Sequence, residues 1–161
     1  MNLFNNKDKI KIVILSFLIL FIGFLSCESI KAETVFEAGA TSLSADFSGG
    51  ADIFITERWD RKWNMGIGLL GEQTTKYDVN INNNLMLFGE RTVYRQDFYL
   101  GLGLAYLGNT TAVNGSHLNY LLSVGYDWNN WGIVLRHISN AGTSPPNSGQ
   151  ELLNIRYAFG R

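Results

Sequence analysis

Charged residues, cysteines and prolines are all scarce in this chain. Asp, Glu, Lys and Arg together make up only 17% of it, against about 25% in soluble globular domains, which argues against an ordinary water-facing surface. Cys27 is the only cysteine, so no disulfide can form within the chain. The only prolines, Pro145 and Pro146, are adjacent, so every earlier segment can contribute to a regular β-ladder.

Basic clusters are absent as well. The chain has a formal net charge of −1, and residues 33–161 hold nine basic and twelve acidic residues, a charge of −3. This balance argues against a broad surface for nucleic acid or another polyanion. No His, Cys and Asp residues show metal-ligand spacing, and no glycine loop suited to phosphate is present, so we expect neither a metal nor a cofactor.

A long apolar run occurs only near the start of the chain. Residues 12–25 are almost entirely apolar and follow three early lysines, a pattern typical of a signal peptide and short for a membrane-spanning helix. Ala32 is a suitable small residue for cleavage. We therefore predict a signal peptide over residues 1–32 and a mature domain over 33–161, with a retained anchor as the alternative. Whether Cys27 is lipidated or lost with the leader stays open.

The mature part instead alternates between apolar and small or polar residues with a period of two. Such alternation, interrupted by turn residues, predicts β-strands. Eight segments show it: 34–43, 49–58, 62–73, 84–94, 96–107, 117–127, 131–139 and 150–159.

The segment 96–107 shows what kind of sheet to expect. One face carries large apolar side chains: Phe98, Leu100, Leu102, Leu104 and Tyr106. The other face carries mainly small residues: Tyr99, Gly101, Gly103 and Ala105. A soluble sandwich would carry charge on its second face, whereas small residues suit the narrow interior of an eight-stranded barrel. Closure also removes the strand edges that lipid does not tolerate.

Aromatic residues near the predicted strand ends support a membrane barrel, because such barrels carry aromatic girdles at both interfaces. They are Trp59, Trp63, Tyr94, Tyr106, Tyr126, Trp128 and Trp131. We therefore predict an all-β fold, an eight-stranded antiparallel transmembrane β-barrel. Together with the leader, this fold indicates the bacterial outer membrane.

Residues 136–151 hold the candidate chemistry. Alternation places His137 and Ser139 on the outer, lipid-facing side of segment 131–139, while Arg136 points inward. Counting back along segment 150–159 places Glu151 on the same wall. Two residues along a strand span about 7 Å and neighbouring strands lie about 5 Å apart, so the three side chains can meet. A serine, a histidine that takes its proton and a carboxylate that orients the histidine form an acyl-transfer triad.

The turn that follows could stabilise an oxyanion through Asn140, Gly142 and Asn147. The simpler interpretation is an ordinary turn beside a polar strand end. His117 has no carboxylate partner nearby in sequence, and we interpret it as an interfacial residue.

The stretch His137-Ile138-Ser139-Asn140-Ala141-Gly142, followed by Pro146-Asn147-Ser148-Gly149 and Glu151, resembles the signature of the lipid A 3-O-deacylase (PagL-type) outer-membrane barrels. The resemblance implies Ser139 as nucleophile, His137 as base and Glu151 as orienting carboxylate. It also implies support of the oxyanion by Asn140, Gly142 and Asn147.

The function expected from this resemblance is hydrolysis of the ester-linked 3-hydroxyacyl chain at position 3 of lipid A (lipopolysaccharide). One alternative is a non-enzymatic small barrel, either an adhesin or a structural anchor, although its loops would be longer than the ten or so residues expected here. Another is a phospholipase or acyltransferase that uses the same triad. The sequence leaves open the acyl-chain length, the regulation of activity, and whether the barrel is a monomer or a homodimer.

Overall fold

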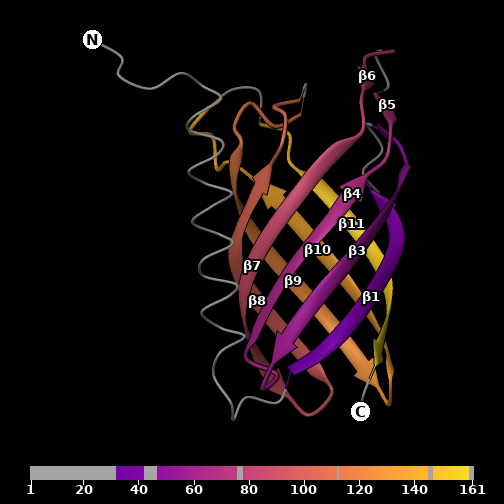
Figure 1. Cartoon of the computed structure of the whole chain (residues 1–161). Coiled ribbons are helices and arrows are strands. Elements are labelled where there is room, and N and C mark those ends of the chain that lie inside the picture. Colours follow the sequence, from indigo (N-terminus) through magenta and orange to yellow (C-terminus); the bar gives the residue numbers. More distant parts are fainter. Residues whose placement is uncertain (1–31, 42–46, 76–77, 112, 145–146, 160–161) are drawn as a thin grey trace. The chain divides into compact units, whose positions relative to one another are not determined.

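The structure is a computed structural model that describes residues 32–41, 47–75, 78–111, 113–144 and 147–159. The predicted leader, with Cys27, lies outside these residues apart from Ala32, which begins the first strand. Eight antiparallel strands close into a barrel in the order β1-β11-β10-β9-β8-β7-β4-β3 (Figure 1). Their bounds are Ala32–Thr41 (β1), Gly50–Trp59 (β3), Trp63–Leu70 (β4), Asn84–Arg95 (β7), Phe98–Leu107 (β8), Leu118–Trp128 (β9), Trp131–Ser139 (β10) and Gln150–Phe159 (β11).

The barrel confirms the predicted all-β, eight-stranded fold, and each of the eight barrel strands overlaps one predicted segment. Burial alternates residue by residue along the strands, as in β9, where Leu121 is fully buried and its neighbours Tyr120 and Leu122 are each 55% exposed. The outer wall is therefore largely apolar. In the described residues no helix is long and apolar enough to cross a membrane.

One boundary of the eight predicted segments differs by more than two residues from the observed barrel strands, and it lies after β4. The segment predicted to run to residue 73 leaves the barrel after Leu70, where the Gly71 amide still donates to the Ala51 carbonyl at 2.7 Å. The chain then forms β5 (Gln73–Thr75) and β6 (Asn80–Ile81), which join β2 (Phe47–Ser48) in a small separate sheet. Residues 74–75 and 80–81, outside the predicted segments, thus also lie in strands.

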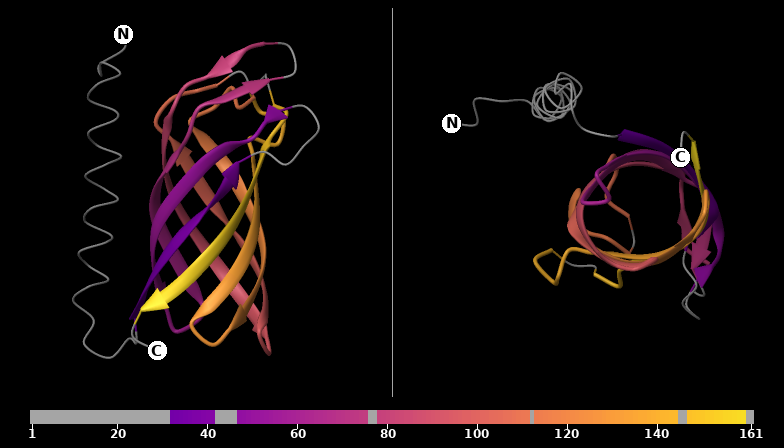
Figure 2. Two further views of the ribbon diagram at one scale, coloured as in Figure 1. Left: turned by 90° about the vertical axis from the view of Figure 1, so that its right-hand side faces the viewer. Right: turned by 90° about the horizontal axis from the view of Figure 1, so that it is seen from below.

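The two ends of the barrel differ in how their strands are joined (Figure 2). At one end, which we call the turn rim, tight turns join β3 to β4, β7 to β8 and β9 to β10. Each turn contains a residue with positive φ, in the left-handed region: Asp60, Gln96 and Asn129. At the other end, the loop rim, longer connections follow β1, β4, β8 and β10. The candidate chemistry lies at the loop rim, since Ser139 ends β10 and Gln150 begins β11.

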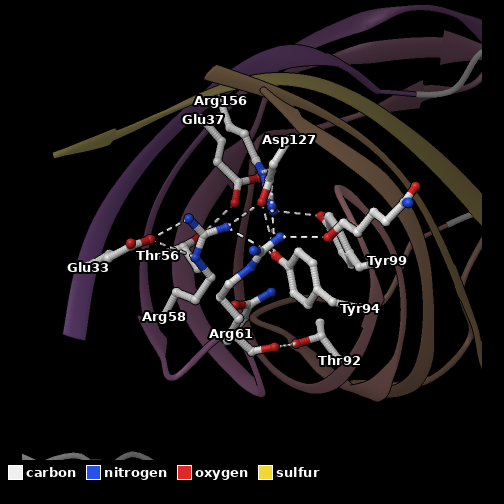
Figure 3. A network of polar contacts seen from close by, with 12 residues as sticks. Glu33, Glu37, Thr56, Arg58, Arg61, Thr92, Tyr94, Tyr99, Asp127 and Arg156 are labelled. Carbon is white, nitrogen blue, oxygen red and sulfur yellow. Dashed lines mark hydrogen bonds and ion pairs between the residues drawn. The ribbon is translucent and has the colours of Figure 1, made fainter. Parts of the chain in front are cut away.

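Buried arginines and their partners occupy much of the barrel interior. Arg136 donates two hydrogen bonds to Glu37, at 2.5 and 3.0 Å, and neither side chain is exposed. Closer to the turn rim, Arg58 and Arg156 both pair with Asp127, at 2.8 and 2.6 Å (Figure 3). Because a buried charge is costly unless it is paired and hydrogen-bonded, each of these arginines depends on its acidic partner.

The small residues predicted on the inner face have a different role from the one expected. They do not fill the interior; they leave room for large side chains. A Cβ on Gly101 would lie 2.2 Å from the Ser123 hydroxyl oxygen and 2.6 Å from a Glu90 carboxylate oxygen, and a Cβ on Gly125 would lie 2.1 Å from the Tyr99 ring.

Two of the aromatic residues assigned to the girdles also differ from expectation. Tyr94 faces the interior, where its hydroxyl bonds Arg58, Asp127 and Arg156 (Figure 3), and Trp59 is only 4% exposed. Trp63, Trp128 and Trp131 do lie on the outer wall, 42–49% exposed.

Candidate active site

His137 and Ser139 lie on the outer wall of β10, as the alternation predicts. Their strand neighbours Arg136 and Ile138 are completely buried on the inner face, whereas the His137 side chain is 45% exposed. Glu151 lies directly across from His137 in the antiparallel pairing of β10 with β11. The last hairpin of the barrel thus brings the three predicted side chains to one patch of wall at the loop rim.

The histidine and the glutamate are in contact. His137 Nδ1 lies 3.2 Å from Glu151 Oε1, and the two side chains are 45% and 31% exposed. Because a carboxylate only accepts hydrogen bonds, this contact requires the hydrogen to be on Nδ1. In the neutral ring Nε2 is then the acceptor, the form that a general base needs.

Gly149 lies against the His137 ring. The sequence alone did not single out this glycine as a site residue. Its φ of +72° lies in the left-handed region, and a Cβ there would sit 2.6 Å from His137 Cε1 and 3.1 Å from Nε2. Both features favour glycine, which has no Cβ and tolerates positive φ. The sequence signal was the glycine two residues before Glu151, but only the folded hairpin reveals its contact with the ring.

Ser139 occupies a defined position beside this pair. Its hydroxyl donates to Asn147 Oδ1 at 2.9 Å and accepts from the Ala141 amide at 3.1 Å. Among the described residues, no hydrogen bond joins Ser139 to His137. Nucleophile–base contacts in unliganded enzymes are often loose and tighten when substrate binds, so this arrangement is compatible with Ser139 as a nucleophile.

The three residues predicted to support an oxyanion are all organised around the same turn. Asn140 is 1% exposed, its Oδ1 accepts from the Gly142 amide at 2.9 Å, and its Nδ2 donates to the Ser144 carbonyl. Its own amide donates to Asn147 Oδ1 at 3.0 Å. A backbone amide needs an acceptor, which fixes that side-chain atom as the oxygen. In the described part of the chain Asn147 Nδ2 has no hydrogen-bond partner, whereas the Gly142 amide already donates to Asn140 Oδ1.

Neither the other histidine nor a metal adds to this patch. His117 is exposed, stacks on Tyr106 with ring centroids 5.6 Å apart, and has Nδ1 2.8 Å from the Leu107 carbonyl oxygen. The described residues contain no group of three or more His, Cys, Asp or Glu side chains that could hold a metal ion.

Comparison with known proteins supports the assignment from sequence. No curated protein sequence matches the chain. A solved structure described as "Crystal structure of the outer membrane enzyme PagL" is similar to it, with a TM-score of 0.52 and 21% identity over 80% of this chain and 99% of that chain. At this identity the likeness establishes the barrel fold alone. The model of the family "Lipid A 3-O-deacylase (PagL)" matches residues 45–160, which is most of the chain. The predicted family, its enzyme class and its outer-membrane barrel architecture are therefore confirmed, and the chain belongs to the lipid A 3-O-deacylase (PagL) family.

Proposed function

We propose that this protein hydrolyses the ester-linked 3-hydroxyacyl chain at position 3 of lipid A, with Ser139 as nucleophile, His137 as base and Glu151 as orienting carboxylate. The observation that carries the proposal is the 3.2 Å contact between His137 and Glu151 on the outer wall, on the same face as Ser139. Ionisable groups on the lipid face of a barrel are costly. A histidine and a glutamate placed there are therefore functional candidates.

The position of the site suits a membrane lipid as substrate. In outer-membrane barrels the short turns face the periplasm and the longer loops face the exterior. The candidate residues lie at the loop rim, and lipid A is found in the outer leaflet. Leu122 and Tyr120 pair across the strand with His137 and Ser139, and each is 55% exposed. This apolar surface suits an acyl chain that is already embedded in the bilayer.

The chemical steps follow from the residues present. Ser139 turns from Asn147 toward His137 Nε2, gives up its proton and attacks the ester carbonyl carbon. The tetrahedral oxyanion collapses, His137 returns the proton to the leaving 3-hydroxyl of lipid A, and the acyl chain stays on Ser139. His137 then deprotonates water, which attacks the acyl carbon. The bond to the Ser139 oxygen breaks, His137 returns the proton to that oxygen, and a free 3-hydroxy fatty acid leaves. Glu151 stabilises the imidazolium form of His137 during both acylation and deacylation.

Asn147 is the best-placed donor for the oxyanion in this scheme. Once Ser139 has turned away, Asn147 Oδ1 keeps its bond from the Asn140 amide, which holds the carboxamide in place. Its Nδ2 is then available for the developing negative charge. A preorganised donor of this kind contributes about 10²- to 10³-fold to turnover.

Replacement of the nucleophile tests the proposal. The Ser139→Ala protein, co-expressed in cells that make lipid A, should fold but leave the mass of lipid A unchanged, while the wild type removes one 3-hydroxyacyl chain. Ser148→Ala is the matched control, since Ser148 is an exposed serine in the same connection and should retain activity.

Equal deacylation by Ser139→Ala and wild type would reject the mechanism. Release of fatty acid from phospholipid with lipid A unchanged would instead indicate a phospholipase that uses the same triad. No change in any lipid, with a folded wild-type barrel, would favour a non-enzymatic role.

A further inference from the structure

The connection between β8 and β9 folds back into the barrel mouth at the loop rim. Connecting loops usually run over the surface, yet Val113 is 2% exposed and Asn114 is completely buried. Thr111 braces this turn, because its amide donates to the Asn114 carbonyl at 2.9 Å and its hydroxyl accepts from the Asn114 amide at 3.0 Å. The buried segment is thus held in a defined conformation.

The same segment is attached to the connection that carries Asn147. Asn114 and Asn147 form an isolated antiparallel β-bridge, and next to it the Ser148 amide donates to the Val113 carbonyl at 2.9 Å. The Ser144 hydroxyl donates to the Gly115 carbonyl at 3.1 Å. A segment more than 30 residues away in the sequence therefore fixes the backbone from which the Asn147 side chain extends.

The Asn114 side chain anchors this attachment to the barrel itself. Its Nδ2 donates to Gln150 Oε1 at 3.3 Å, and Gln150, the first residue of β11, is 1% exposed. The next residue in that strand is Glu151. Asn114 thus links, from inside the barrel mouth, the start of the strand that carries Glu151 with the loop that carries Asn147.

We propose that Asn114 is a positioning residue for the hydrolytic site, setting the place of Asn147 and, through it, the orientation of Ser139. This proposal rests on the proposed function, in which Ser139 attacks the ester. Asn147 Oδ1 accepts from both the Ser139 hydroxyl and the Asn140 amide, so a shift of Asn147 moves both groups. A displacement of about 1 Å in a catalytic group can cost about 100-fold in rate.

A purely structural role for Asn114 predicts a different result. If Asn114 only filled the barrel mouth, its loss would weaken the barrel without changing turnover by the molecules that stay folded. The two roles are distinguished by kcat per folded molecule. This quantity does not depend on how much of the protein is unfolded, because only the folded fraction is counted.

The test compares Asn114→Ala with Asn109→Ala, an exposed asparagine in the same connection. Purified protein is assayed on lipid A in detergent micelles, and the folded fraction is counted from tryptophan fluorescence. We expect kcat to fall about 10- to 100-fold in Asn114→Ala with little change in KM. The rate of Ser139 labelling by a fluorophosphonate probe should fall by the same factor, and Asn109→Ala should match the wild type.

A double variant tests the route of the effect. If Asn114 acts through Asn147, the loss in Asn114→Ala/Asn147→Ala should be close to that in Asn147→Ala alone, because coupled residues are not additive. Independent losses that multiply would overturn the proposal, as would an unchanged kcat in Asn114→Ala. If Asn114→Ala does not fold, Ser144→Ala cuts the tie to Gly115 instead and should lower kcat in the same way.

Failure of this proposal can be told apart from failure of the proposed function. If Ser139 is not the nucleophile, the wild type is not labelled by the probe and Ser139→Ala keeps its activity. If only the role of Asn114 is wrong, Ser139→Ala is inactive while Asn114→Ala turns over lipid A like the wild type.

Discussion

Arg136 and His137 are adjacent in β10, and each faces a glutamate, yet their surroundings are opposite. Arg136 points inward and binds Glu37 with two hydrogen bonds, and neither side chain is exposed. His137 points outward and contacts Glu151 through one interaction, with the two side chains 45% and 31% exposed. One peptide unit thus separates a closed ion pair from an open histidine–glutamate pair.

The difference shows how one strand can combine stability with reactivity. The Arg136 guanidinium also lies 4.7 Å from the centre of the Phe88 ring and 3.8 Å from Glu90, so it is enclosed on several sides. A group held in this way cannot exchange protons or approach a substrate. The His137 ring keeps one nitrogen free of its carboxylate partner and faces the wall where a lipid ester can reach it.

The largest expected effect comes from breaking the open pair. Glu151→Gln should lower the rate of fatty acid release from lipid A by about 10³-fold, because an amide neither stabilises the imidazolium nor fixes the tautomer with the hydrogen on Nδ1. The free energy of unfolding should change much less than on loss of the Arg136–Glu37 pair, since the two side chains are 45% and 31% exposed and are not enclosed. Glu72→Gln, another exposed acid that follows β4, serves as control; an equal loss there would show that the effect is not local.

Breaking the closed pair should have the reverse outcome. Arg136→Met leaves Glu37 buried without its main cation and should lower the free energy of unfolding by about 3–5 kcal/mol, measured by urea unfolding in detergent. Activity per folded molecule should stay close to that of the wild type. The double variant Arg136→Met/Glu37→Leu should regain most of the stability, because a buried ion pair can be replaced by apolar side chains; no recovery would contradict this account.

The smallest effect comes from a residue that belongs to neither pair but lies against the His137 ring. Gly149→Ala should slow turnover about 10- to 100-fold, because its Cβ would displace the His137 ring. Gly142→Ala is the comparison for backbone strain: its φ of +76° is similar, but its Cβ would meet nothing within 4 Å. Similar losses in the two variants would mean that strain in the turn, and not contact with the ring, controls the rate.

The outer wall of this barrel could be predicted from sequence because the information is local. The alternation in residues 131–139 placed His137 and Ser139 outward and Arg136 inward, and the observed burial agrees. The pairing of His137 with Glu151 could also be expected, because the two strands are consecutive and antiparallel.

Contacts between distant parts of the chain could not be predicted in this way. Arg136 and Glu37 are 99 residues apart, and the alternation placed Arg136 inward without indicating which acid would pair with it. The bridge between Asn114 and Asn147 joins two irregular loops, where no period marks which residues turn inward. Residues 73–75 and 80–81 form strands because they find partners outside the barrel, and their composition alone resembles a loop.

The outward direction of His137, Ser139 and Glu151 also determines how a substrate arrives. A lipid anchored in the leaflet reaches this wall by lateral diffusion and never needs to leave the bilayer. The quantity that governs encounter is therefore the mole fraction of the lipid in the membrane plane, not its amount per volume of water. Under the proposed function, catalysis by this hairpin is thus controlled by the crowding and composition of the surrounding lipid surface.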